Sequence, residues 1–153
     1  MYTSSQHLWR TVDDGHSWQM ISPDLTRGDP KTLGDSGGPI THDQNGPEIY
    51  GTIFTIAPSR KEKDTIWTGS DDGMVYITRD GGKHWTKITP PGMPDFGRVS
   101  LIDASPSDAG TAYTCGVTEP FRKLLDRARL CWWLHWHGPL IIPTLVAAAL
   151  RIP

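Results

Sequence analysis

Short stretches of alternating apolar and polar residues recur along the chain, and clusters of Gly, Pro, Asp and Asn separate them. A period of two places every second side chain on one face of an extended strand, so the pattern predicts half-buried β-strands joined by turns. We expect no long helix in the first three quarters of the chain, and an all-β fold overall. The expected strands are Gln6–Thr11, Trp18–Ser22, Tyr50–Ala57, Thr65–Gly69, Met74–Thr78, Trp85–Thr89, Val99–Ala104 and Thr111–Thr114.

One strand–turn–strand stretch occurs twice, as LWRTVDDGHSW at residues 8–18 and as VYITRDGGKHW at residues 75–85. The Asp carboxylate can accept backbone N–H bonds and close the turn, and the Gly supplies a positive φ. The Trp is expected to fold its ring under the turn, where burial contributes about 3 kcal/mol or more. The matched residues are Thr11, Asp13, Gly15 and Trp18 in the first copy and Thr78, Asp80, Gly82 and Trp85 in the second.

The repeated pattern resembles the aspartate box, Ser/Thr-x-Asp-x-Gly-x-x-Trp, of bacterial neuraminidase-type repeats. From about Leu8 to Tyr113 the chain is similar to sortilin-type and glycosyl-hydrolase-like β-propellers of exported bacterial proteins. The resemblance implies that each box joins the third and fourth strands of an antiparallel blade. Residues 50–89 then form one four-stranded blade, preceded by two strands of another blade and followed by two strands of a third.

About two blades are present on this interpretation, whereas a closed propeller usually has about four to eight. We therefore expect residues 1–114 to form a partial β-propeller and residues 115–153 to form an atypical hydrophobic tail. The expected partners include the missing blades of a parent propeller. Because each blade buries its faces against its neighbours, the isolated chain is expected to be aggregation-prone or marginally folded.

The overall charge carries little information about partners. The formal net charge is −2, from 15 basic and 17 acidic residues, and no basic stripe is visible, so we expect no nucleic-acid binding. We expect no cofactor and no metal. The N-terminus lacks the basic and apolar regions of a signal peptide. The resemblance implies an exported family, but the sequence leaves the location of this chain open.

The Gly-, Asp- and Pro-rich segment Pro23–Pro47 is the expected inter-blade loop, and loops on a rigid scaffold often hold ligand contacts. We expect a carbohydrate or protein ligand there, bound without complete catalytic machinery. The alternative is a glycoside hydrolase, which needs two carboxyl groups about 5 Å or about 6.5–9.5 Å apart. No spacing selects a pair, and Asp71-Asp72-Gly73 is interpreted as a hairpin turn. The candidate loop contacts are Asp24, Asp29, Asp35, Ser36, Asp43 and Glu48; further carboxylates are Asp71, Asp72, Asp95 and Asp103.

Residues 34–39 read GDSGGP, the nucleophile motif of trypsin-like serine proteases, which would make Ser36 the nucleophile. In that family the catalytic His and Asp precede the Ser by long stretches of barrel. Here 35 residues precede Ser36, and the upstream histidines are His7 and His16, outside any such motif. We interpret the hexapeptide as an inter-blade loop, since the propeller relatives carry a similar Ser-Gly-Gly-Pro-Ile loop, and keep the protease as an alternative.

The composition changes near Cys115, after which no further box occurs. We consider three interpretations of the segment after Cys115, and the first is a frameshifted gene end. A membrane helix is the second, although Pro143 and other breakers interrupt the uncharged span, and Leu140–Leu150 is too short to cross a bilayer. A metal site with Cys131, His135 and His137 as ligands is the third, and we set it aside because three ligands at this unfamiliar spacing are more often accidental. Phe121–Leu130 is a candidate short helix.

Overall fold

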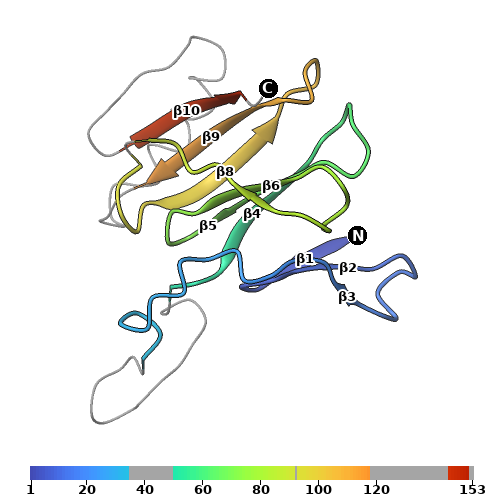
Figure 1. Cartoon of the computed structure of the whole chain (residues 1–153), viewed down its shortest axis with the longest axis horizontal. Helices are drawn as coiled ribbons and strands as arrows, with labels where there is room; N and C mark the ends of the chain where they lie inside the picture. The colour runs from blue at the N-terminus through green and yellow to red at the C-terminus, as the bar shows by residue number, and fades with distance from the viewer. Residues whose placement is uncertain (35–49, 92, 118–144, 152–153) are drawn as a thin grey trace.

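Every regular element in the described part of the chain is a β-strand (Figure 1). The computed structural model describes residues 1–34, 50–91, 93–117 and 145–151. Its ten strands form three antiparallel sheets, which we call the first, second and third sheet in chain order. The prediction of an all-β fold with antiparallel pairing is confirmed for these residues.

The second sheet is a four-stranded meander with the strand order β4-β5-β6-β7. Its strands are β4 (Ile53–Pro58), β5 (Ile66–Ser70), β6 (Val75–Thr78) and β7 (Thr86–Lys87). All four lie within a few residues of the predicted positions, with the aspartate-box stretch between β6 and β7. All five residues of β5 are buried, because this strand lies between the other two sheets.

The first sheet contains β1 (Tyr2–Ser4), β2 (Leu8–Arg10) and β3 (Gln19–Met20), in that order. Strands β2 and β3 correspond to the two predicted strands before the segment Pro23–Pro47. Strand β1 was not predicted, because its sequence Tyr-Thr-Ser holds one large apolar side chain and shows no alternation. Antiparallel pairing with β2 holds it in the sheet.

The third sheet has the order β10-β9-β8. Strands β8 (Arg98–Ala104) and β9 (Thr111–Val117) confirm the two predicted strands, and β9 extends beyond Thr114. Strand β10 (Leu145–Arg151) pairs with β9 along all seven of its residues. No strand was predicted for this segment, because a uniform run of Leu, Val and Ala has no polar alternation to mark one face.

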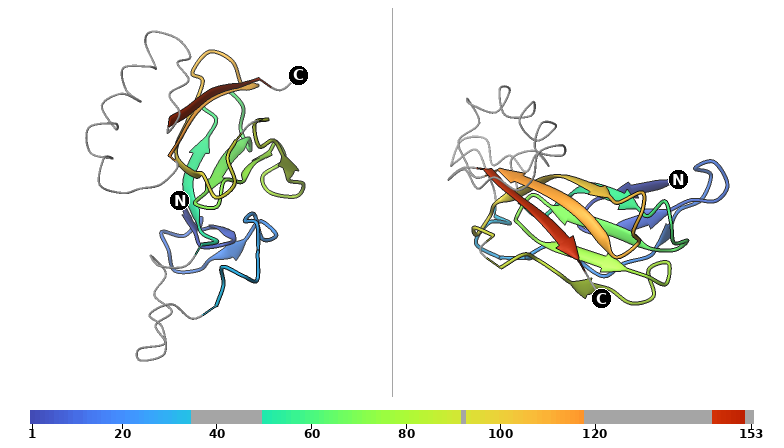
Figure 2. Two further views of the ribbon diagram at one scale, coloured as in Figure 1. Left: turned by 90° about the vertical axis from the view of Figure 1, so that its left-hand side faces the viewer. Right: turned by 90° about the horizontal axis from the view of Figure 1, so that it is seen from above.

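The three sheets follow one another through the molecule, with the second between the first and the third (Figures 1 and 2). Each contact between neighbouring sheets has its own apolar core. The core between the first and second sheets holds Leu8, Ile21, Leu25, Ile53 and Ile66. The core between the second and third sheets holds Ala57, Trp67, Val75, Ile77, Val99, Ile102, Ala104 and Ala112. Full burial of one such aliphatic side chain contributes about 1.5–3 kcal/mol.

The antiparallel order places alternate connections at opposite ends of each sheet. The β2–β3 and β6–β7 hairpins, which carry the aspartate boxes, lie at one end, on the right in Figure 1; we call it the box end. The β4–β5 connection shares this end, since Gly81 N–H donates to the carbonyl of Asp64 at 2.9 Å. The β5–β6 turn and the segments that enter and leave the second sheet lie at the other end, the loop end.

Candidate functional site

The first aspartate box closes on its own side chains. The Thr11 hydroxyl donates to Asp13 Oδ1 at 2.7 Å and accepts the Gly15 N–H at 2.9 Å. Asp13 also accepts the Ser17 N–H at 2.9 Å and the Ser17 hydroxyl at 2.5 Å. These donors lower the pKa of Asp13 from 3.8 to about 2, with the Ser17 hydroxyl as the largest cause. The carboxylate is therefore a turn-former.

The second box repeats this arrangement. Thr78 donates to Asp80 Oδ1 at 2.9 Å and accepts the Gly82 N–H at 3.0 Å. Asp80 accepts the His84 N–H at 2.9 Å, and His84 Nδ1 lies 2.5 Å from its second oxygen, in the place of the serine hydroxyl of the first box. The backbone N–H of His84 is the main cause that lowers the pKa of Asp80. The two box glycines have φ values of 94° and 101°, so the prediction of positive φ is confirmed.

Equivalent positions in the two hairpins are 67 residues apart, as Thr11 and Thr78 show (78 minus 11). This equivalence extends past the boxes. The Ser22 hydroxyl accepts the Leu8 N–H at 2.7 Å. The Thr89 hydroxyl accepts the Val75 N–H at 3.0 Å, which is the same bond one repeat later. The role of these hydroxyls was missed, although both residues precede a proline directly after the predicted strand.

The two box tryptophans differ in their surroundings. Trp85 is half-buried and packs against the core between the first and second sheets, and its Nε1 donates to the carbonyl of Ile21 at 2.9 Å. Trp18 is 39% exposed, so the prediction that its ring is buried is wrong. Trp85 is enclosed because the first sheet packs against it. Among the described residues, no neighbouring sheet covers Trp18 in the same way, so its ring stays exposed although its hairpin is the same.

At the loop end, two adjacent carboxylates anchor the segments that enter the second sheet. Asp72 is 2% exposed and accepts the Arg27 N–H at 2.6 Å and the Ser70 hydroxyl. Asp71 accepts the N–H groups of Gly51 and Thr52 at 3.0 and 2.9 Å, and burial is the main cause that raises its pKa. The predicted β5–β6 turn is present, and its carboxylates also hold the inter-sheet loop.

The predicted loop contacts divide into two groups. Asp24 accepts the N–H and hydroxyl of Thr26 at 2.8 and 2.6 Å, and Asp29 accepts the Lys31 N–H at 3.0 Å, so both form local turns. Asp35, Ser36, Asp43 and Glu48 lie outside the described residues. So do all but the first residue of the GDSGGP hexapeptide, the candidate helix Phe121–Leu130 and the candidate metal ligands Cys131, His135 and His137.

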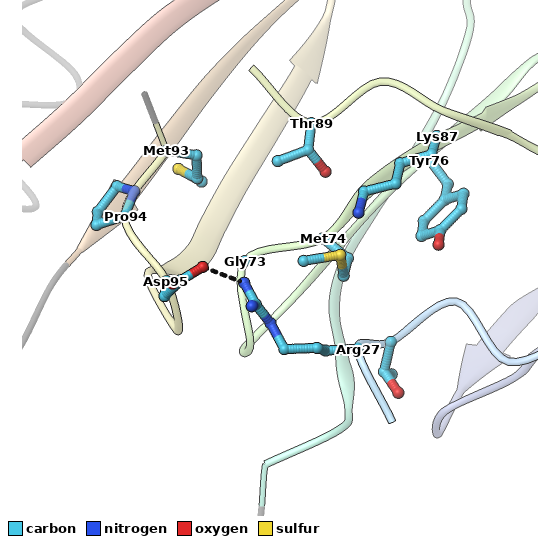
Figure 3. A pocket seen from close by; sticks show the side chains of 10 residues that line it. Arg27, Gly73, Met74, Tyr76, Lys87, Thr89, Met93, Pro94 and Asp95 are labelled. Atoms are coloured by element: carbon cyan, nitrogen blue, oxygen red, sulfur yellow. Dashed lines mark ion pairs between the residues drawn. The ribbon is translucent and has the colours of Figure 1, made fainter. Parts of the chain in front are cut away.

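A cavity of about 450 Å³ lies at the loop end, between the loop that follows the first sheet, the second sheet and the chain before β8 (Figure 3). Arg27 Nη2 and Asp95 Oδ1 form an ion pair across it at 2.9 Å. The Arg27 guanidinium lies 4.7 Å from the centre of the Phe96 ring, which also contacts Tyr50. The lining residues are Thr26, Arg27, Gly73, Met74, Tyr76, Lys87, Thr89, Met93, Pro94 and Asp95.

The cavity combines polar donors and acceptors with apolar surface. Arg27 and Lys87 supply positive charge, Asp95 supplies the single carboxylate among these lining residues, and two methionines and a proline supply apolar area. Burial is the main cause that raises the pKa of Tyr76, and the charges of Asp24 and Asp72 add to it. Its phenol is therefore a neutral hydrogen-bond donor at pH 7.

The described residues contain no group of three or more His, Cys, Asp or Glu side chains arranged to hold a metal ion. Within the same residues, no helix has the length and apolar character needed to cross a membrane. Neither a protein-family model nor a curated protein sequence matches the chain.

Proposed function

We propose that this chain is part of an aspartate-box β-propeller, with its sheets as blades, that binds a carbohydrate in the loop-end cavity. Support for the propeller comes from the two box hairpins, which share their hydrogen bonds in sheets that pack face to face. Each blade of a propeller packs on its neighbours in this way.

The observation that carries the ligand proposal is the composition of the cavity. Sugars present hydroxyl groups beside apolar C–H faces, and the cavity offers the Arg27–Asp95 pair and the Tyr76 phenol beside the apolar Met74 and Pro94. Binding sites commonly join a few placed polar groups to apolar walls. Glycoside hydrolysis needs a pair of carboxyl groups, and Asp95 is the single one among the described lining residues. We therefore propose binding without turnover.

Carbohydrate binding is tested with an array of neutral and acidic oligosaccharides, followed by calorimetry on the best ligand. Arg27→Ala and Asp95→Ala should each weaken binding about tenfold or more, since a hydrogen bond to a charged group contributes about 1.5–3 kcal/mol. Arg60→Ala is the matched control, because Arg60 is an exposed arginine of the β4–β5 connection at the box end. Equal binding by all three variants, or release of cleaved sugar, would contradict the proposal.

A further inference from the structure

The first sheet has one face turned toward the second sheet and one turned away. Leu8 belongs to the core between these sheets, so alternation along β2 places Trp9 on the opposite side. Met20 pairs directly with Trp9 across the β2–β3 ladder and lies on the same side. Met20 is 51% exposed and the nearby box residue Trp18 is 39% exposed. We call Trp9, Trp18 and Met20 the open face.

The second sheet shows what covers the equivalent face one repeat later. The offset of 67 residues makes Tyr76 the counterpart of Trp9 and Trp85 the counterpart of Trp18. Tyr76 and Trp85 both pack against the core that the first sheet shares. The Trp85 indole also donates to the carbonyl of Ile21. The equivalent face of the second sheet is therefore covered by a neighbouring β-sheet, the first sheet.

The open face is more apolar than its covered counterpart. The cross-strand pair is Trp9–Met20 in the first sheet and Tyr76–Lys87 in the second, where Tyr76 is half-buried and Lys87 stays exposed. Each Å² of apolar surface removed from water contributes about 25 cal/mol. The more apolar of two equivalent faces thus has more free energy to gain from a covering sheet.

The third sheet presents apolar side chains on its own outer side. Ile102 and Ala112 belong to the core with the second sheet. The neighbouring residues Leu101 and Tyr113 therefore point the other way, and they are 48% and 45% exposed. The outer side of the third sheet and the open face of the first sheet lie at opposite ends of the stack (Figure 2).

We infer that the open face binds the outer side of the third sheet of a second copy of this chain, head to tail. This contact continues the packing already present between the first and second sheets and between the second and third. It joins different surfaces on the two copies, so it builds chains of copies or closes into a ring. The inference rests on the proposed propeller, whose neighbouring blades the second copy would supply, and it is independent of carbohydrate binding, which uses the loop end.

The test is the concentration dependence of mass, by sedimentation velocity on the full chain. The wild-type protein should exceed its monomer mass of 17.0 kDa increasingly as concentration rises. Trp18→Lys should weaken association at least tenfold, because the counterpart of Trp18 in the covered face is Trp85, which packs against the neighbouring sheet and donates to the carbonyl of Ile21. Leu33→Lys is the matched control, because Leu33 is 45% exposed on the loop after the first sheet.

A mixture of two variants then tests the pairing of surfaces. Leu101→Lys should also weaken self-association, because it damages the other half of the contact. Mixed with Trp18→Lys, it leaves one intact open face and one intact third-sheet face, so the mixture should form dimers that grow no further. A wild-type chain that stays at 17.0 kDa, a Leu33→Lys effect as large as that of Trp18→Lys, or a mixture that stays monomeric overturns the inference.

Discussion

Asp13 and Asp80 are prominent in the repeated sequence pattern, but their carboxylates accept hydrogen bonds within their own turns. Each accepts hydrogen bonds from a hydroxyl and from the backbone four residues later. A carboxylate bonded in this way is held ionised, because its donors favour the charged form. General acid catalysis needs the opposite, a carboxyl group that keeps its proton.

These carboxylates predict how stability depends on pH. The pKa of Asp13 falls from 3.8 to about 2 on folding, and the pKa of Asp80 is lowered as well. A lowered pKa in the folded state stabilises the protein above the ordinary value, and this contribution is lost as pH falls from about 4 toward 2. The urea midpoint should therefore drop across this range.

The variant Asp13→Asn, Asp80→Asn is the control for that measurement. It should start from a lower midpoint at pH 6 and lose less of it on acidification. Asp71, whose pKa is raised by burial, contributes with the opposite sign and is unchanged in the variant. A wild-type midpoint that stays flat between pH 5 and pH 2 would contradict the assignment.

At the level of elements, the hairpins follow from local sequence, because turn residues and alternation act within about a dozen positions. The two aspartate boxes were located in this way, with their glycines and hydrogen-bonding residues. The local sequence does not predict strands β1 and β10. Each is held by pairing with another strand, β2 or β9, whose sequence does not indicate which segment pairs with it. The exposure of Trp18 was also missed, because it depends on a neighbouring sheet.

The two box glycines give a prediction about how a hairpin packs on the next sheet. A Cβ added at Gly82 would lie 2.3 Å from the carbonyl oxygen of Ile21, whereas at Gly15 the nearest atom is 3.8 Å away. Both have positive φ, so alanine brings backbone strain of about 1–3 kcal/mol at either site. Gly82→Ala should cost about 2 kcal/mol more, because it also separates the first and second sheets. Urea denaturation measures both; equal losses would show that the contact is unimportant.

For the whole molecule, the stack of sheets separates two kinds of surface. At the box end, the carboxylates bond within their own turns and the contacts to other segments come from Gly81, Gly82 and Trp85. The loop end gathers polar side chains from distant segments. Arg27, Lys87 and Asp95 line one cavity, yet no spacing in the sequence relates them. The sequence predicts ligand contacts in the loop Pro23–Pro47 and points to its acidic residues. The described cavity instead takes Arg27 from this loop, and the cavity's carboxylate, Asp95, lies outside it.

The joint between the first and second sheets can be tested through the two tryptophans. Trp85→Phe removes the donor to the Ile21 carbonyl, and an unsatisfied buried acceptor costs about 1–3 kcal/mol. Trp18→Phe makes the same chemical change on a ring that is 39% exposed, so it should cost under about 0.5 kcal/mol. Amide hydrogen exchange locates the effect. Because Trp85 joins the second sheet to the first, Trp85→Phe should accelerate exchange in β2, a strand it does not belong to. Faster exchange confined to the β6–β7 hairpin would mean that the sheets are held together without this hydrogen bond.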